Sequence, residues 1–267
     1  MKDILDYAGR TVVVSGCATG MGAAAARTLV DLGAEVHALD VKPVEIAVKQ
    51  SLAVDLRDRD SIDQAVSRLP AAVDVHFNCA GLPGPPFSTL DTMLVNFVGL
   101  RHLTEAVLPR VPRGGAVASI TSVAGMGYRK NIDAVNELLA TPDFESGRAW
   151  CADNPEKANG YLFSKQCIIA YTLRRAAELA PDGIRVNCLS PAPTDTPMMD
   201  DFESQIGKDF MVEHFQAPVG RNATPEEMAE PLVFLGSRAA RFVSGVNLFV
   251  DFGYTAAVDA GLRPALL

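Results

Sequence analysis

Short apolar, β-branched runs alternate along the chain with longer stretches in which apolar residues recur at helical spacing. We expect strands at residues 11–15, 35–39, 52–54, 74–77, 116–120, 185–189 and 247–250. Strands that are buried on both faces and separated by helices usually form a parallel sheet with right-handed crossovers. The pattern therefore predicts an α/β fold, a doubly wound, mainly parallel seven-stranded sheet with helices on both faces.

One segment breaks this alternation. Residues 123–159 are polar and contain Pro and Trp150, although a short loop would be enough to reach the next helix, predicted at residues 158–179. We interpret this segment as an insertion with helical turns of its own, whose Trp150 stacks either on a flat ligand or within a small local core. No repeat or low-complexity linker divides the sequence. With 48% apolar composition, residues 1–267 are expected to form a single domain.

Composition argues against several classes of function. The formal net charge is −8 and the Lys and Arg residues are scattered, so nucleic acid is not expected as a partner. No apolar run approaches the roughly 18 residues that cross a bilayer. The chain starts with Met-Lys-Asp-Ile-Leu-Asp, which has acids where a signal peptide would be apolar. We expect a cytoplasmic protein with no membrane partner.

The cysteines and histidines give no sign of a metal site. The five cysteines contain no C-x-x-C pair, and the four histidines do not cluster with them. We expect free thiols and no bound metal.

Glycines mark the junction between the first strand and the following helix. Gly16, Gly20 and Gly22 have the spacing G-x-x-x-G-x-G, and a run of alanines follows. Gly16 permits a tight turn, Gly20 lets the backbone approach a pyrophosphate, and Gly22 lets the helix pack close to the sheet. Such a pattern is weak alone, and a plain strand-to-helix turn is the alternative. Its position after a buried strand and before a helix predicts a dinucleotide-binding turn.

Asp40, at the end of the second strand, indicates which dinucleotide is bound. A carboxylate there accepts hydrogen bonds from the adenine ribose hydroxyls and repels a 2′-phosphate, and no Arg immediately follows it. The sequence therefore favours NAD over NADP, although Lys42 lies nearby.

Tyr161 and Lys165 lie one helical turn apart in the predicted helix and therefore share a face. A phenol titrates near 10, and a neighbouring cation is expected to lower the pKa of Tyr161. Tyr161 can then act as acid in reduction and as base in oxidation. Ser122, just past the fifth strand, is placed at the carboxyl edge of the sheet to hold the substrate oxygen.

These motifs together resemble the short-chain dehydrogenase/reductase family, which has a Rossmann fold, over the whole chain. The matching segments are Gly16 to Gly22, Asp55, Asn78-Cys-Ala-Gly81, Asn96, Ser122, Tyr161 with Lys165, and Asn187-Cys-Leu-Ser-Pro-Ala-Pro-Thr-Asp-Thr196. The resemblance implies a catalytic tetrad of Asn96, Ser122, Tyr161 and Lys165. It implies that Asn96 helps to hold a proton-relay water and that Lys165 binds the nicotinamide ribose.

The resemblance also implies which residues contact the cofactor. Asp55 would meet the adenine edge, the segment from Asn78 to Gly81 would line the cofactor, and Pro191 and Thr196 would contact the nicotinamide end. The full predicted set is Gly16, Ala18, Thr19, Gly20, Met21, Asp40, Asp55, Leu56, Asn78, Ala80, Gly81, Tyr161, Lys165, Pro191, Thr194 and Thr196.

Two departures from the family pattern refine this interpretation. Ala192 replaces the glycine that usually follows Pro191, and the gap between Ser122 and Tyr161 is unusually long. The long insertion and Cys79-Ala-Gly-Leu-Pro83 resemble the bacterial 3α-hydroxysteroid dehydrogenase/carbonyl reductase subgroup, and coniferyl-alcohol dehydrogenases are similar.

The resemblance implies NAD-dependent interconversion of a secondary alcohol and a ketone, with a steroid-sized or aromatic substrate. It also implies a homodimer or homotetramer. We expect the insertion to lie over the start of the Tyr161 helix or beside the pocket mouth, where it would add wall to the pocket. The segment 198–218 is expected to cover the substrate. The alternatives are an aryl-alcohol dehydrogenase, a dinucleotide-binding module without chemistry, and a nucleotide-sugar epimerase.

Overall fold

A single parallel sheet organises the computed structural model, which describes residues 4–264. Its strands are β1(Thr11–Ser15), β2(Glu35–Asp40), β3(Gln50–Ala53), β4(Val75–Asn78), β5(Ala116–Ile120), β6(Arg185–Pro191) and β7(Asn247–Val250), in the order β3-β2-β1-β4-β5-β6-β7. Every neighbouring pair is parallel. All seven predicted strands are confirmed, with ends that differ by at most two residues.

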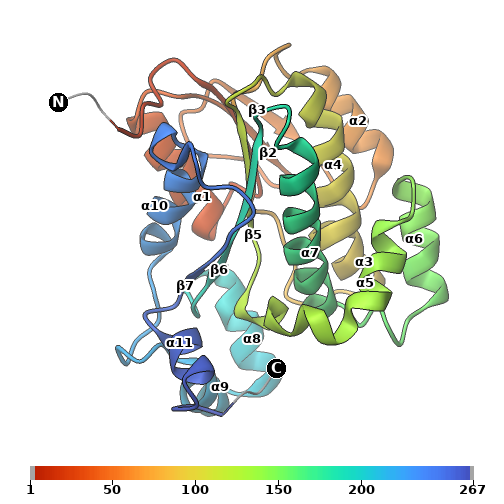
Figure 1. Cartoon of the computed structure of the whole chain (residues 1–267), viewed down its shortest axis with the longest axis vertical. Coiled ribbons are helices and arrows are strands. Elements are labelled where there is room, and N and C mark those ends of the chain that lie inside the picture. Colours follow the sequence, from red (N-terminus) through yellow and green to blue (C-terminus); the bar gives the residue numbers. More distant parts are fainter. Residues whose placement is uncertain (1–3, 265–267) are drawn as a thin grey trace.

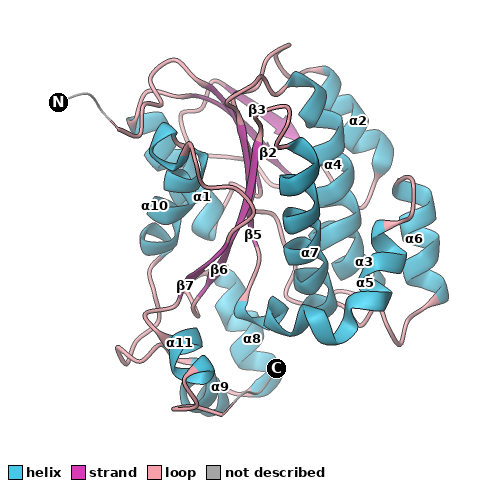
Figure 2. Ribbon diagram, viewed as in Figure 1, coloured by secondary structure: helices cyan, strands magenta, loops and turns pink. Residues whose placement is uncertain are grey.

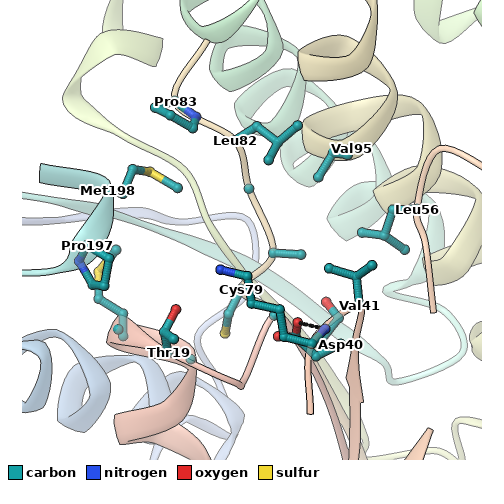
Figure 3. A pocket seen from close by; sticks show the side chains of 18 of the residues that line it. Thr19, Asp40, Val41, Leu56, Cys79, Leu82, Pro83, Val95, Pro197 and Met198 are labelled. Atoms are coloured by element: carbon teal, nitrogen blue, oxygen red, sulfur yellow. Dashed lines mark hydrogen bonds between the residues drawn. The ribbon is translucent and has the colours of Figure 1, made fainter. Parts of the chain in front are cut away.

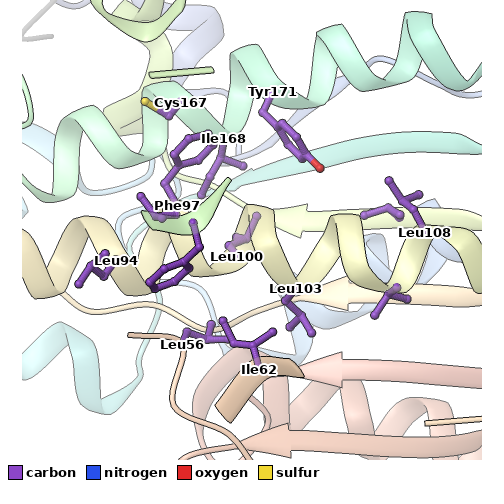
Figure 4. Packing of buried hydrophobic residues seen from close by; sticks show 14 of the residues in the cluster. Leu56, Ile62, Leu94, Phe97, Leu100, Leu103, Leu108, Cys167, Ile168 and Tyr171 are labelled. Carbon is purple, nitrogen blue, oxygen red and sulfur yellow. The ribbon is translucent and has the colours of Figure 1, made fainter. Parts of the chain in front are cut away.

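Helices cover both faces of the sheet, as predicted (Figures 1 and 2). α1(Gly20–Asp31) and α10(Pro225–Gly236) pack together on one face, and α2(Arg59–Ser67), α4(Leu100–Val107) and α7(Tyr161–Leu179) cover the other. Each face of the sheet has its own apolar core, because successive side chains of a strand point to opposite faces. Val12 and Val14 point to the first core, on the α1 side, and Val13 points to the second core, on the α7 side. Figure 4 shows the second core, where Leu103 of α4 and Ile168 of α7 lie among other apolar side chains.

Between β4 and β5 the chain passes through four helical pieces. α3(Thr89–Met93) continues into a π-helical turn, Leu94–Gly99, and then into α4. A side chain at Gly99 would meet the carbonyl oxygen of Leu56 at 2.0 Å, so only glycine permits this close approach of the helix to the segment after β3. The short 3₁₀ segments Leu108–Arg110 and Arg238–Ala240 follow α4 and α10.

The insertion folds as a 3₁₀ segment, Val123–Asn131, followed by α5(Ile132–Leu139) and α6(Phe144–Asp153). α5 packs on the outer side of α7, and α6 packs on α3 and the π turn (Figure 1). The buried guanidinium of Arg101 on α4 donates to the carbonyl oxygens of Leu138, Thr141 and Asp143, which ties the insertion to the main helical layer.

Trp150 belongs to the local core of the insertion and does not reach a ligand cavity. Its ring stacks on Phe163 of α7 with 5.9 Å between centroids and an interplanar angle of 18°. The insertion therefore has the predicted helical turns, but the prediction that it walls the pocket is wrong beyond its first residues. The sequence of a long polar segment does not indicate whether the segment folds toward the site or away from it.

At the carboxyl ends of β6 and β7 lie α8(Pro197–Ile206), α9(Lys208–Phe215) and α11(Tyr254–Asp259), grouped at the lower end of Figure 1. No helix among residues 4–264 is both long enough and apolar enough to cross a membrane.

Candidate active site

The glycine turn after β1 is packed too tightly for side chains. Gly16 has φ +72°, and a Cβ there would lie 2.3 Å from the backbone of Ala80. A Cβ at Gly22 would lie 2.0 Å from the carbonyl oxygen of Gly16, so α1 starts in direct contact with the turn. Gly20, Met21 and Gly22, the first residues of α1, line the cavity beside the turn, and the start of a helix is where backbone amides can bind an anionic pyrophosphate.

Asp40, the last residue of β2, is hydrogen-bonded to the glycine turn. Its Oδ2 accepts from the backbone N–H of Ala18 at 2.9 Å, and its Oδ1 accepts from the backbone N–H of Lys42 at 2.9 Å. Two backbone amides therefore fix the carboxylate beside the cavity that the turn borders. Ala18 contributes its amide to this arrangement and is not among the residues that line the cavity.

A cavity of about 370 Å³ runs along the glycine turn and the ends of the strands. Figure 3 shows Thr19 and Pro197 toward one end and Val41 and Leu56 toward the other. The predicted cofactor residues that line this cavity are Gly16, Thr19, Gly20, Met21, Asp40, Asp55, Leu56, Ala80, Gly81 and Thr196. The cavity has glycines without room for side chains along one wall and the carboxylate of Asp40 at another. These are the features expected of a site for an extended dinucleotide.

Arg57 is a residue of this cavity that the sequence analysis missed. Its guanidinium donates to both carboxylate oxygens of Asp55, at 3.0 Å and 2.6 Å, and these hydrogen bonds hold the pKa of Asp55 below its usual value. An adenine contacting Asp55 would therefore meet a carboxylate that already has a cationic partner.

Asn78 and Asn96 support the site from behind. The amide of Asn78 donates to the hydroxyls of Thr104 and Ser119, and its side chain is buried between β4, α4 and β5 rather than in the cavity. The side chain of Asn96 accepts from the N–H of Leu82 at 2.7 Å and donates to the Leu82 carbonyl at 3.0 Å. Asn96 thus clamps the backbone of a segment that borders the cavity.

Ser164 was not predicted, and it links Asn96 to the tyrosine helix. Its fully buried hydroxyl accepts from the amide of Asn96 at 3.2 Å and donates to the carbonyl oxygen of Tyr161 at 2.6 Å. The Y-x-x-x-K motif specifies only its two end residues, so it could not predict a role for the serine between them.

Ser122, Tyr161 and Lys165 come together at the start of α7. The ammonium of Lys165 lies 5.3 Å from the centre of the Tyr161 ring and donates to the carbonyl of Ile120 at 3.3 Å. Burial lowers the pKa of Lys165 to about 8. Burial also raises the pKa of Tyr161, and the neighbouring Ser122 hydroxyl opposes this rise.

This direction is opposite to the one predicted for Tyr161. The prediction considered the charge of Lys165 alone, whereas the desolvation of the phenolate at this half-buried position outweighs the favourable interaction with Ser122. A raised pKa keeps the phenol protonated at neutral pH, which suits a proton donor.

A second cavity of about 200 Å³ begins at Ser122 and Tyr161. Its wall includes Pro191 at the end of β6 and Thr194 just after this strand. It shares Met21, Thr196 and Met198 with the first cavity, so the two cavities meet there. The predicted covering segment supplies most of the outer wall through residues of α8 and α9: Met198, Met199, Phe202, Ile206, Met211 and Phe215. From the insertion, Val123 and Ala124 take part.

Comparison with known proteins identifies the family. The family models described as "short chain dehydrogenase" and "Enoyl-(Acyl carrier protein) reductase" match residues 10–133 and 152–255. Coniferyl-alcohol dehydrogenase of Pseudomonas sp. (strain HR199 / DSM 7063) is 32% identical, over 91% of this chain and 96% of that protein. The chain belongs to the short-chain dehydrogenase/reductase family.

Other short-chain dehydrogenases agree with this identification. The 3-alpha-hydroxysteroid dehydrogenase/carbonyl reductase of Comamonas testosteroni is 31% identical, over 95% of this chain and 98% of that protein. The crystal structure of the 3-alpha-hydroxysteroid dehydrogenase from Pseudomonas sp. B-0831 complexed with NADH has the same fold, with TM-score 0.79, 24% identity and coverage of 96% of this chain and 100% of that one. The protein is thus an oxidoreductase that acts on CH–OH groups, and the alternative of a module without chemistry is set aside.

The five cysteines of this short-chain dehydrogenase are all free. Within residues 4–264, no group of three or more His, Cys, Asp or Glu side chains is arranged to hold a metal ion. Burial raises the pKa of Cys17 to about 12, so this thiol beside the glycine turn stays protonated and packs rather than reacts.

Proposed function

We propose that the protein interconverts a secondary alcohol and a ketone, with NAD(H) as the hydride carrier and Tyr161 as the general acid and base. The observation that carries this proposal is that Tyr161 and Ser122 line the apolar cavity, which adjoins the cavity along the glycine turn at Met21, Thr196 and Met198. A ketone in the second cavity has its oxygen within reach of both hydroxyls. An aryl-alcohol dehydrogenase is the second candidate, and the aromatic side chain of Phe202 beside Tyr161 favours it.

In this proposal each residue of the predicted tetrad has a separate role. The Oγ of Ser122 donates a hydrogen bond that orients the substrate oxygen. The Oη of Tyr161 gives its proton to that oxygen in reduction and takes it back in oxidation. Lys165 binds the nicotinamide ribose through its ammonium group, and Asn96 holds the Leu82 segment that borders the cofactor. NAD(H), when bound, donates or accepts the hydride.

The experiment is the Tyr161→Phe variant, which keeps the ring and removes the proton. The rate of ketone reduction should fall by a factor of roughly 10² or more, while NADH binds as in the unmodified protein. Tyr128→Phe is the matched control, because Tyr128 lies in the insertion and lines neither cavity. Normal turnover by the Tyr161→Phe variant would refute the assignment.

Cofactor choice rests on Asp40. The backbone amides of Ala18 and Lys42 hold its carboxylate at the cavity wall, where a 2′-phosphate would be repelled. NADH should therefore bind more tightly than NADPH in titration calorimetry, and Asp40→Ala should narrow the difference. Equal or tighter binding of NADPH by the unmodified protein contradicts this preference.

A homodimer formed through the β7 edge is proposed in place of a tetramer. The insertion covers part of the outer surface of α7, while Phe242, Phe249 and Phe252 are exposed around β7. Exposed aromatic side chains around an unpaired strand edge favour association. Sedimentation of the Phe242→Glu variant should show weaker assembly than the unmodified protein, and a tetramer built on α7 would contradict the proposal.

A further inference from the structure

The wall of the second cavity is apolar apart from a few hydroxyl groups. Among the residues described, those that line it carry no Asp, Glu, Lys, Arg or His side chain. Its hydroxyls belong to Ser122, Tyr161, Thr194 and Thr196, and the hydroxyl of Thr194 is already donated to the carbonyl of Ala192 at 2.8 Å. Ser122 and Tyr161 are proposed to bind the reacting oxygen, which leaves the hydroxyl of Thr196, a residue predicted to contact the nicotinamide end, as the remaining side-chain hydrogen-bonding group of the lining residues.

The surroundings of the cavity disfavour an anion further. The two helices that cover it, α8 and α9, carry one lysine and one histidine among several acids: Asp200, Asp201, Glu203, Lys208, Asp209, Glu213 and His214. Arg263 also approaches α9, and its guanidinium donates hydrogen bonds to the carbonyl oxygens of Gln216 and Glu213. An ionised group at the end of the substrate remote from Lys165 would lose its hydration in the cavity without gaining a counter-ion, which is costly.

The size and the side chains of the cavity favour one ring. Its volume of about 200 Å³ lies below the range of roughly 300–1,000 Å³ that holds drug-sized ligands. The Phe202 ring contacts Tyr161 edge to face, with 5.0 Å between centroids, and Met199 and Met211 line the same space. Thioethers adapt to the shape of a ligand and make favourable contacts with aromatic rings.

From these observations we infer that the substrate is a neutral, one-ring aryl ketone or its secondary alcohol, and that the pocket rejects carboxylated analogues. This inference rests on the proposed function and narrows it. It selects the aromatic substrate over the steroid-sized one, and it places the selection in α8 and α9 rather than in the insertion.

The test compares three ketones of one shape with NADH: para-methylacetophenone, para-acetylbenzamide and para-acetylbenzoate. We expect kcat/KM for the benzoate to be about 100-fold or more below that for the amide, because the amide matches its size and lacks its charge. A neutral ketosteroid is the fourth substrate and should be turned over more slowly than para-methylacetophenone. Equal kcat/KM for benzoate and amide, or faster turnover of the steroid, overturns the inference and leaves the proposed function standing.

A charge introduced at the wall gives an independent readout. Ile206 lines the cavity and is 47% exposed, so a polar side chain fits there without disturbing the core. Ile206→Lys should raise the ratio of kcat/KM for the benzoate over the amide by about tenfold or more, whereas Ile206→Gln should not. An unchanged ratio in the lysine variant counts against the inference. If no ketone is reduced although calorimetry shows NADH binding, the proposed function fails with it.

Discussion

Acid should destabilise this protein through His76, a fully buried residue of β4. Burial lowers the pKa of His76 from 6.5 to about 4, although the side chain of Asn78 and the backbone of Val13 oppose this shift. Below pH 6.5 the unfolded chain binds a proton that the native chain refuses until about pH 4, so stability falls across this window. The expected loss is about 2 kcal/mol between pH 7.5 and pH 5, and about 3 kcal/mol by pH 4.

The assay is urea unfolding at fixed protein concentration, at pH 7.5 and pH 5, for the unmodified protein and for His76→Met. Carboxylates that titrate in the same range contribute equally to both proteins, so the difference between the two pH effects isolates His76. The variant should lose about 2 kcal/mol less on acidification. If the two proteins lose the same free energy to within about 0.5 kcal/mol, His76 is not the acid-sensitive group.

Three further outcomes test the supports of the site. Arg101→Leu should lower the free energy of unfolding by about 2–4 kcal/mol, because it strands the carbonyl oxygens that tie the insertion to α4, whereas the exposed Arg148→Leu in the same insertion should change it little. NADH affinity should fall as pH rises through about 8, where Lys165 loses its proton, and calorimetry of Lys165→Met should show weak binding without this pH dependence. Gly16→Ala should abolish NADH binding, since its methyl group would lie 2.3 Å from the Ala80 backbone; tight binding by this variant would disprove the close packing of the turn.

The sheet and the glycine turn could be predicted because their requirements are local. A buried strand needs a short apolar run, and every predicted run became a strand. Gly16 and Gly22 occupy positions where a Cβ would collide with backbone, so the spacing of the glycines already contained the geometry of the turn. The roles of Asn96 and Asp55 were less accessible, because Asn96 bonds the backbone of Leu82, which any residue carries, and Arg57, the partner of Asp55, belongs to no motif.

The direction of the pKa shift at Tyr161 could not be predicted from the sequence, for a different reason. Spacing on a helix correctly placed Lys165 beside Tyr161, but it contains no information on how far both are removed from water. The depth of burial comes from the packing of α7 against the sheet, and burial determines the direction in which both pKa values move.

The apolar pocket was the least predictable part of the site, because its wall is held by contacts between distant segments. Ser122 follows a strand and is placed by the rules of parallel sheets, but α8 and α9 obey no such rule. Gln205, near the end of α8, donates to the carbonyl of Pro85 at 2.8 Å. Arg263 donates to the carbonyl of Gln216 at 2.9 Å, where its charge also complements the carboxyl end of α9. Since these contacts fix the ends of the two helices that line the apolar cavity, the position of its wall depends on Gln205 and Arg263 as well as on the side chains that line it.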